Sequence, residues 1–321
     1  TAGSVLTEAS ALAWALLLKE LLSLRAGSEE RRQLAKFARS GELVSSLLTN
    51  LFHSLDLPRA SSKRAEHNPS QRRLQDVAAS IGSMAVSRLF AIEDVFPVSL
   101  DPETDQGAQM YLQLYCCVLR ALPASARQWF SEIRDRHLSA SIEQFTVKFL
   151  SPHLLAEEIA AVQRAQISDD DFTVNASKGT GDVVVTYKYE EAKMQMVIQL
   201  SPYYPLRPIA VECSQRVGIS ESKVRKWLLG ITVLLRNQNG GILEAAALWK
   251  ENTDKMFEGL EECAICYFVV SNTDRTLPKM VCGVCRKGFH HSCMHRWFSS
   301  SGKSNCPHCQ SAWTTYKSPK A

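Results

Sequence analysis

Residues 263–309 read CAICYFVVSNTDRTLPKMVCGVCRKGFHHSCMHRWFSSSGKSNCPHC, and they contain four pairs of potential metal ligands. In each pair two residues separate the ligands, so both side chains can occupy neighbouring corners of one zinc tetrahedron. The eight candidate ligands are Cys263, Cys266, Cys282, Cys285, His290, Cys293, Cys306 and Cys309. Eight ligands make two closed four-coordinate sites without a position for water. We therefore expect two structural zinc ions, whose binding drives the folding of this segment.

The distribution of cysteines along the chain favours metal binding over disulfide bonding. Seven of the ten cysteines fall between Cys263 and Cys309, whereas disulfide scaffolds spread them through a small secreted domain. We therefore expect a reducing compartment, the cytosol or the nucleus. The other three, Cys116, Cys117 and Cys213, lie among apolar residues. We interpret them as buried core thiols.

The order of the ligands resembles the RING finger family, in a version with cysteine at the fourth ligand position. The resemblance implies a cross-brace, in which the first and third pairs bind one ion and the second and fourth pairs bind the other. The Phe-His-x2-Cys motif at 289–293 matches the family's aromatic–His–x2–Cys and favours His290 as a ligand. His291 or His295 could replace it, although we interpret both, together with His308, as surface residues.

A histone-reading PHD finger has the same order of ligands, so residues between the ligands must separate the two families. A PHD finger usually has an aromatic residue two positions before its seventh ligand, where this chain has Ser304. RING fingers that recruit a ubiquitin-conjugating enzyme are similar to this chain at Ile265, Trp297 and Pro307. Together these three are expected to form a shallow apolar groove, as an interface anchor requires. RING is therefore favoured, and a non-catalytic, PHD-like reader or scaffold is the alternative.

The RING resemblance implies a ubiquitin ligase that forms no covalent intermediate. The family docks a conjugating enzyme charged with ubiquitin and holds its thioester for attack by a substrate lysine, which is catalysis by positioning. The residue after the last ligand contacts ubiquitin and the conjugating enzyme and is often Arg in the family. Here it is Gln310, whose neutral amide predicts a weaker contact. No cysteine of this segment is left to carry ubiquitin.

The middle of the chain has the pattern of an α+β unit. The expected strands cover 182–189, 194–200 and 208–213, and the expected helices cover 220–236 and 241–257. The sequence SPYYPLRP at 201–208 resembles the Tyr-Pro turn of the RWD domain and of the related ubiquitin-conjugating enzymes. An active conjugating enzyme has a catalytic cysteine in the region that follows, but this chain has none between Cys213 and Cys263. The resemblance therefore implies a binding domain of RWD type.

The beginning of the chain follows a helical pattern that one polar stretch interrupts. The expected helices cover 4–27, 29–38, 42–55, 74–90, 105–122, 125–136, 139–150 and 153–166, with Ser4 as a candidate cap. The polar stretch 58–73 has five basic residues and is expected to be a solvated loop. Helix pairs with short turns predict the end of an α-solenoid. The longest apolar run, 12–18, is too short to cross a membrane, and a start in helical pattern without methionine indicates part of a longer protein.

The whole chain resembles the RING-type ligases of ribosome-associated quality control in its order of helical repeats, RWD domain and RING finger.

 The features that the resemblance implies are HEAT-like repeats, a monomeric protein in the cytosol without a membrane partner, and binding to the large ribosomal subunit. It further implies transfer of ubiquitin to nascent chains stalled there. The basic residues near the 220–236 helix then become candidates for contact with rRNA or ribosomal proteins. They are Arg216, Lys223, Arg225 and Lys226. The net charge of +4 alone does not indicate nucleic acid.

The sequence therefore predicts a multi-domain protein that combines α and α+β parts. A helical-repeat (HEAT-like) segment is expected at 1–168 and an RWD-type α+β domain at 169–260. A cross-brace RING zinc finger is expected at 261–315, followed by a short tail at 316–321.

Overall fold

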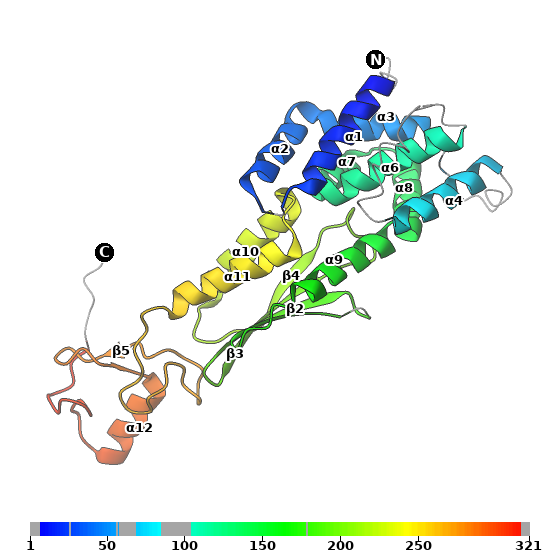
Figure 1. The fold of residues 1–321 in the computed structure, drawn as a ribbon. Coiled ribbons are helices and arrows are strands. Elements are labelled where there is room, and N and C mark those ends of the chain that lie inside the picture. Colours follow the sequence, from blue (N-terminus) through cyan, green and yellow to red (C-terminus); the bar gives the residue numbers. More distant parts are fainter. Residues whose placement is uncertain are drawn as a thin grey trace.

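The structure is a computed structural model that describes residues 7–25, 27–55, 57, 69–84, 104–177 and 179–315. Figure 1 shows the helical N-terminal part at one end of the molecule and the cysteine-rich segment at the other, with a sheet and its helices between them. Within the described ranges, no helix is long and apolar enough to cross a membrane.

The starts of the N-terminal helices are set by capping side chains and prolines. The elements are α1 (Glu8–Ser23), α2 (Glu29–Arg39), the short 3-10 helix η1 (Ser40–Glu42), α3 (Leu43–Ser54), α4 (Pro69–Ser83), α6 (Asp105–Ala121), α7 (Pro123–Glu132), α8 (Arg136–Phe149) and α9 (Ser151–Ala165). Thr7, Ser28, Thr104 and Asp135 each accept a hydrogen bond from a backbone N–H group of the helix that follows. These bonds satisfy donors that have no partner within the helix. α7 and α9 have proline in their first turn instead.

Two sequence predictions in the helical part are wrong at their boundaries. α4 begins at Pro69, so the last residues of the predicted loop 58–73 are helical. Proline fits the first turn because its missing N–H would have had no partner there and its φ is already helical. The same helix ends at Ser83 rather than at Phe90. The segments 58–68 and 85–90 and the predicted cap Ser4 lie outside the described residues.

The middle of the chain contains a four-stranded antiparallel sheet in the order β1-β2-β3-β4. The strands are β1 (Phe172–Ala176), β2 (Asp182–Tyr189), β3 (Ala192–Gln199) and β4 (Ala210–Gln215). The sequence predicted three strands and missed β1. In this short strand only Phe172 and Val174 are buried, and three aspartates precede it, so its alternating pattern is too brief to detect.

Three helices pack on this sheet. α9 contacts β1, α11 (Ile242–Phe257) contacts β2 and α10 (Glu221–Asn237) contacts β4. Trp249 of α11 is completely buried and meets the ring of Trp227 of α10 edge-on, with centroids 5.8 Å apart. At the other end of α11, Phe257 stacks on Tyr189 of β2 at 4.1 Å. Aromatic pairs of this kind stabilise a core beyond the area that they bury.

Arg127 of α7 joins the helical part to the α+β unit. Its guanidinium donates hydrogen bonds to the carbonyl oxygens of Pro205 (3.0 Å) and Arg236 (3.0 Å). Arg39 of α2 donates to the carbonyl of Asn237 at 2.8 Å. Both arginines therefore satisfy carbonyls at the C-terminal end of α10, where helical partners are lacking and positive charge is favourable. One apolar core runs through both parts, which fixes them against each other.

The cysteine-rich segment has a small apolar cluster of its own. It contains β5 (Met280–Val281), β6 (Gly288–Phe289) and α12 (His291–Ser301). Phe289 and Met294 are completely buried, and the ring of Trp313 packs edge-on against Phe289 and Phe298. Because so few apolar side chains contribute, metal binding must supply much of the folding free energy of this segment.

Candidate zinc centres and docking groove

Three of the four ligand pairs form the same backbone turn. In each turn the N–H of the residue after the second ligand donates to the carbonyl of the first ligand. The bonds run from Tyr267 to Cys263 (2.8 Å), from Arg286 to Cys282 (3.1 Å) and from Gln310 to Cys306 (3.0 Å). The three donor residues have positive φ values of 60°, 63° and 59°. This left-handed conformation, uncommon outside glycine, turns the chain back around the two sulfur atoms.

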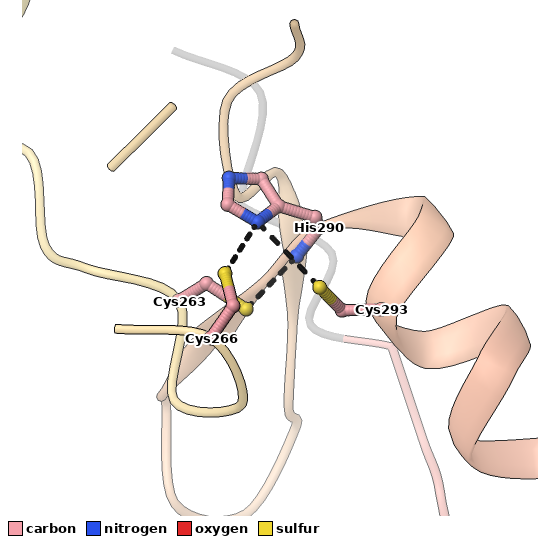
Figure 2. Close-up of side chains that lie close together, drawn as sticks. All are labelled: Cys263, Cys266, His290 and Cys293. Carbon is pink, nitrogen blue, oxygen red and sulfur yellow. Dashed lines mark hydrogen bonds between the residues drawn. The ribbon is translucent and has the colours of Figure 1, made fainter. Parts of the chain in front are cut away.

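The first ligand cluster consists of Cys263, Cys266, His290 and Cys293 (Figure 2). Nδ1 of His290 lies 3.3 Å from Sγ of Cys266 and 3.8 Å from Sγ of Cys293. Nε2 of the same ring lies 3.1 Å from the carbonyl oxygen of Val269. This contact places the proton on Nε2, so Nδ1 directs its lone pair into the cluster, as in metal-binding histidines.

Backbone N–H groups favour the thiolate form of Cys263. The N–H of His290 donates to its Sγ at 3.4 Å. Burial raises the pKa of the Cys263 thiol, but N–H groups of Cys266, His290 and Ile265 outweigh burial and hold this pKa below its ordinary value. The thiolate is the form of cysteine that binds a metal ion.

The second ligand cluster consists of Cys282, Cys285, Cys306 and Cys309. The Sγ atoms of Cys282 and Cys309 are 3.9 Å apart, and those of Cys285 and Cys306 are 3.8 Å apart. Two sulfur atoms bound to one tetrahedral zinc ion at about 2.3 Å lie about 3.8 Å from each other. The donor sets and spacings of both clusters therefore fit two structural zinc ions in a cross-brace.

The structure shows which of the neighbouring histidines belongs to the first ligand cluster, a choice that the sequence left open. His290 is completely buried and belongs to the first cluster. His291, His295 and His308 are exposed. His290 is the N-cap residue of α12, so its side chain points back toward the ligand turn, whereas His291 and His295 lie on the outer surface of the helix.

A groove of about 370 Å³ lies beside the first cluster, and both Ile265 and Trp297 line it. The indole N–H of Trp297 donates to the carbonyl of Asn305 at 2.9 Å, which fixes the ring at the edge of the groove. The sequence did not indicate Phe268 and Arg296, which also line the groove. Their only sequence signal is that they lie beside Cys266 and Trp297.

The other two predicted docking residues lie near the second cluster. Pro307 is half-buried in the last ligand turn and does not line the groove. Gln310 is exposed, and its backbone is fixed by the turn that closes on Cys306. Its side-chain amide has no hydrogen bond within the described part of the chain, so it can donate to a bound protein.

Three family models match the chain in succession. The model described as LTN1 family HEAT repeat region matches residues 8–163. Ubiquitin conjugating domain-like matches residues 172–256, and Ring finger domain matches residues 261–310. These matches confirm the predicted fold class: a HEAT-like helical region, a domain of the UBC-like or RWD type, and a C-terminal RING finger.

Relatives named E3 ubiquitin-protein ligase listerin match the chain across large evolutionary distances. The Xenopus tropicalis protein is 35% identical over 303 residues, which are 93% of this chain and 17% of the relative. The chain is a listerin homologue. The mouse protein is 40% identical over 61% of this chain and 11% of the relative, and the Schizosaccharomyces pombe protein is 38% identical over 66% and 13%. The chain therefore spans less than a fifth of the length of these relatives.

The UBC-like domain of this listerin homologue has a helix in the region after the Tyr-Pro turn. Tyr204 and Pro205 of this turn are joined by a cis peptide bond. α10 follows β4 and continues to Asn237 without a cysteine. The sequence 214–262 thus contains no thiol that could form a thioester with ubiquitin.

The four basic side chains in and just before α10 of this listerin homologue differ in how far their charge is compensated by neighbouring groups. Arg216 and Arg225 both form ion pairs with Glu221, the first at 3.6 Å. The Lys223 ammonium lies 5.7 Å from the centroid of the Trp227 ring. Lys226 is exposed and has no ion pair among the described residues. Lys226 therefore presents the least compensated charge of the four.

Proposed function

We propose that this chain acts as a RING-type ubiquitin ligase. In this proposal Cys263, Cys266, His290 and Cys293 hold one structural zinc ion, and the four cysteines of the second cluster hold the other. The observation that carries the proposal is the groove lined by Ile265 and Trp297 beside the first cluster. A groove in which Ile265, Phe268 and a fixed indole lie among polar side chains suits an interface anchor, because buried aromatic residues contribute most to such contacts.

The proposed reaction takes place on a docked ubiquitin-conjugating enzyme. Ile265 and Trp297 bind this enzyme, and Pro307 extends the contact from the last ligand turn. Gln310 donates a hydrogen bond from its amide to ubiquitin or to the conjugating enzyme and so restricts their relative motion. The thioester of the conjugating enzyme is then held in a reactive orientation for a substrate lysine, and the rate gain comes from lost freedom of motion.

The proposed substrates are nascent chains stalled on the large ribosomal subunit in the cytosol. Support comes from the likeness to listerin along the helical, UBC-like and RING parts. In this proposal the chain is monomeric, and Arg216, Lys223, Arg225 and Lys226 contact rRNA or ribosomal proteins. Contacts between basic side chains and phosphate groups would make this binding weaken with added salt.

A non-catalytic reader of PHD type is not favoured. The zinc segment matches a RING finger model, and Ser304 is an exposed polar residue rather than the aromatic residue of a PHD finger.

The proposed function can be tested with purified chain, activating enzyme, ubiquitin and a panel of conjugating enzymes. We expect ubiquitin chains with at least one member of the panel, and a strong decrease for Ile265→Ala and for Trp297→Ala. Val284→Ala is the matched control, because Val284 is 61% exposed in a ligand turn and does not line the groove. Absence of chains with the whole panel would refute ligase activity. Equal activity in all variants would refute the assigned groove.

A further inference from the structure

A carboxylate of the α+β unit binds backbone N–H groups of the zinc finger. Glu190 lies in the turn between β2 and β3 and has a positive φ of 52°. Its two oxygens accept hydrogen bonds from the N–H of Val269 at 2.9 and 3.1 Å, and one of them also accepts from the N–H of Val270 at 3.1 Å. Both valines are nearly completely buried. Glu190 itself is exposed, but hydrogen bonds to an ionised carboxylate are roughly twice as strong as those between neutral groups.

Val269 connects this carboxylate to the first ligand cluster. Its N–H donates to Glu190, while its carbonyl accepts a hydrogen bond from Nε2 of His290 at 3.1 Å. The second bond orients the imidazole so that Nδ1 faces the cysteine sulfur atoms. A single residue therefore separates the carboxylate of one domain from a zinc-ligand candidate of the next. Groups that orient a metal-binding histidine typically change metal affinity by about 10- to 100-fold.

The two valines that Glu190 holds lie between two stretches that line the groove. Phe268, directly before the two valines, lines the groove, and so do the residues 271–273 directly after them. The side chain of Val270 packs into the large core that the helical part and the α+β unit share. Contacts from outside the zinc finger therefore fix this segment, and the segment connects two stretches that line the groove.

A second contact restrains the same interface. Arg275 donates to the backbone carbonyl of Glu191 at 3.3 Å, and its own carbonyl accepts the N–H of Gly218 at 2.8 Å. Gly218 has a φ of 68°, and a Cβ there would lie 2.8 Å from the side chain of Leu277. The zinc finger is thus held on the α+β unit by side-chain and backbone contacts in addition to the connecting chain.

We infer that Glu190 is a positioning residue through which the α+β unit orients His290 and supports the groove wall. The carboxylate binds the N–H groups of Val269 and Val270, and the N–H of Val270 belongs to the same peptide group as the Val269 carbonyl, which orients the imidazole. The effect on the groove rests on the proposed ligase function. The effect on the first zinc site does not, because it follows from the hydrogen-bond chain alone.

The test compares Glu190→Gln with wild type in the full chain loaded with two zinc ions. The amide keeps the length of the side chain but replaces one acceptor oxygen with a donor, which cannot bind an N–H group. Glu191→Gln is the matched control, because Glu191 is exposed and takes part through its backbone carbonyl only. Zinc release to a chromogenic chelator gives the rate for each ion, and ¹¹³Cd NMR of the cadmium-loaded chain distinguishes a site with three sulfur ligands from one with four.

We expect the zinc ion of the first site to leave roughly tenfold faster in Glu190→Gln than in wild type. This factor is at the lower end of the range of effects for groups that orient a metal-bound histidine. The ¹¹³Cd resonance of the three-sulfur site should shift while that of the four-sulfur site stays in place. Glu191→Gln should match wild type in both measurements. Unchanged release and an unchanged spectrum in Glu190→Gln would overturn the inference. Equal acceleration at both sites would also overturn it, since it would indicate general destabilisation. Neither measurement involves ubiquitin, so the inference can fail or succeed independently of ligase activity.

Discussion

Ile265 and Trp297 line the same groove, although Ile265 belongs to the first ligand turn and Trp297 to α12. Cys266 directly follows Ile265, and Cys293 lies one helical turn before Trp297. Both cysteines belong to the first ligand cluster, which brings the turn and the helix together. The apolar cluster of the segment is small, so it cannot hold this arrangement without the metal. We therefore expect the groove to depend on the zinc ion of the first site.

Replacement of His290 by alanine should remove one of two zinc ions. The chain has two separate clusters, and only the first loses a ligand. Native mass spectrometry should give two zinc ions for wild type and one for His290→Ala. His295→Ala is the control and should retain both, because His295 is exposed on α12. A single ion in wild type, or loss of an ion in His295→Ala, would contradict the cross-brace assignment.

Replacement of Arg127 by methionine should destabilise the junction between the helical part and the α+β unit. The guanidinium satisfies the carbonyls of Pro205 and Arg236, and the buried Pro205 carbonyl would be left without this partner. Loss of such hydrogen bonds from a charged donor should lower the free energy of unfolding by about 2–3 kcal/mol. Urea unfolding measures this loss, with the exposed Arg134→Met as control. Equal stability of the two variants would show that the junction does not depend on Arg127.

Glu158 should make the stability of the chain depend on pH. The hydroxyl of Tyr204 donates to its carboxylate at 3.0 Å, but burial outweighs this bond and raises the pKa of Glu158. The folded chain therefore keeps this proton to higher pH than the unfolded chain does. The contribution of Glu158 to stability is therefore fully present below the ordinary pKa of glutamate and is lost as the pH rises through the raised value.

The variant Glu158→Gln removes this titration. Urea unfolding between about pH 4 and 8 should show a flatter dependence of stability on pH in the variant than in wild type. Glu132→Gln is a control on the surface of α7 and should retain the wild-type dependence. A wild-type pH dependence in Glu158→Gln would refute the role of this carboxyl group.

Spacing in the sequence was sufficient to predict the eight ligands because the two ligands of each pair are close in sequence, and in three of the four pairs they form a local turn. It did not distinguish the histidines, since the choice depends on the contact between His290 and the distant Val269. Glu190 was missed for the same reason. A glutamate in a turn has no sequence signal of its own, and its role arises only when the turn meets the zinc finger.

The helical pattern predicted most helices but was weakest where local signals oppose each other. The proline and polar residues at 69–73 read as a loop, whereas the structure uses Pro69 to begin α4. β1 was missed because its five residues give too little alternation to compete with the acidic run before it. In both places tertiary packing, rather than local pattern, decides the structure.

Substitution of Lys226 by glutamate should weaken binding to large ribosomal subunits more than Arg225→Glu does. Arg225 is already paired with Glu221, whereas Lys226 has no ion pair among the residues that the structure describes. Cosedimentation at increasing salt measures the effect, because each lost phosphate contact reduces the salt dependence. Lys223→Glu combined with Arg225→Glu should also weaken binding. Lys255→Glu on α11 is the control, and equal binding of all variants would exclude this face of α10 from the interface.

The measurement that tests the proposed function most directly is single-turnover discharge of ubiquitin from a charged conjugating enzyme to free lysine. We expect the wild-type chain to accelerate discharge from at least one conjugating enzyme in a panel. Trp297→Ala should abolish most of this acceleration, because loss of a central interface anchor typically costs about 2 kcal/mol or more, or roughly 30-fold in affinity. Val284→Ala should accelerate discharge as wild type does. No acceleration with any conjugating enzyme, or full acceleration by Trp297→Ala, would contradict a RING ligase that works through this groove.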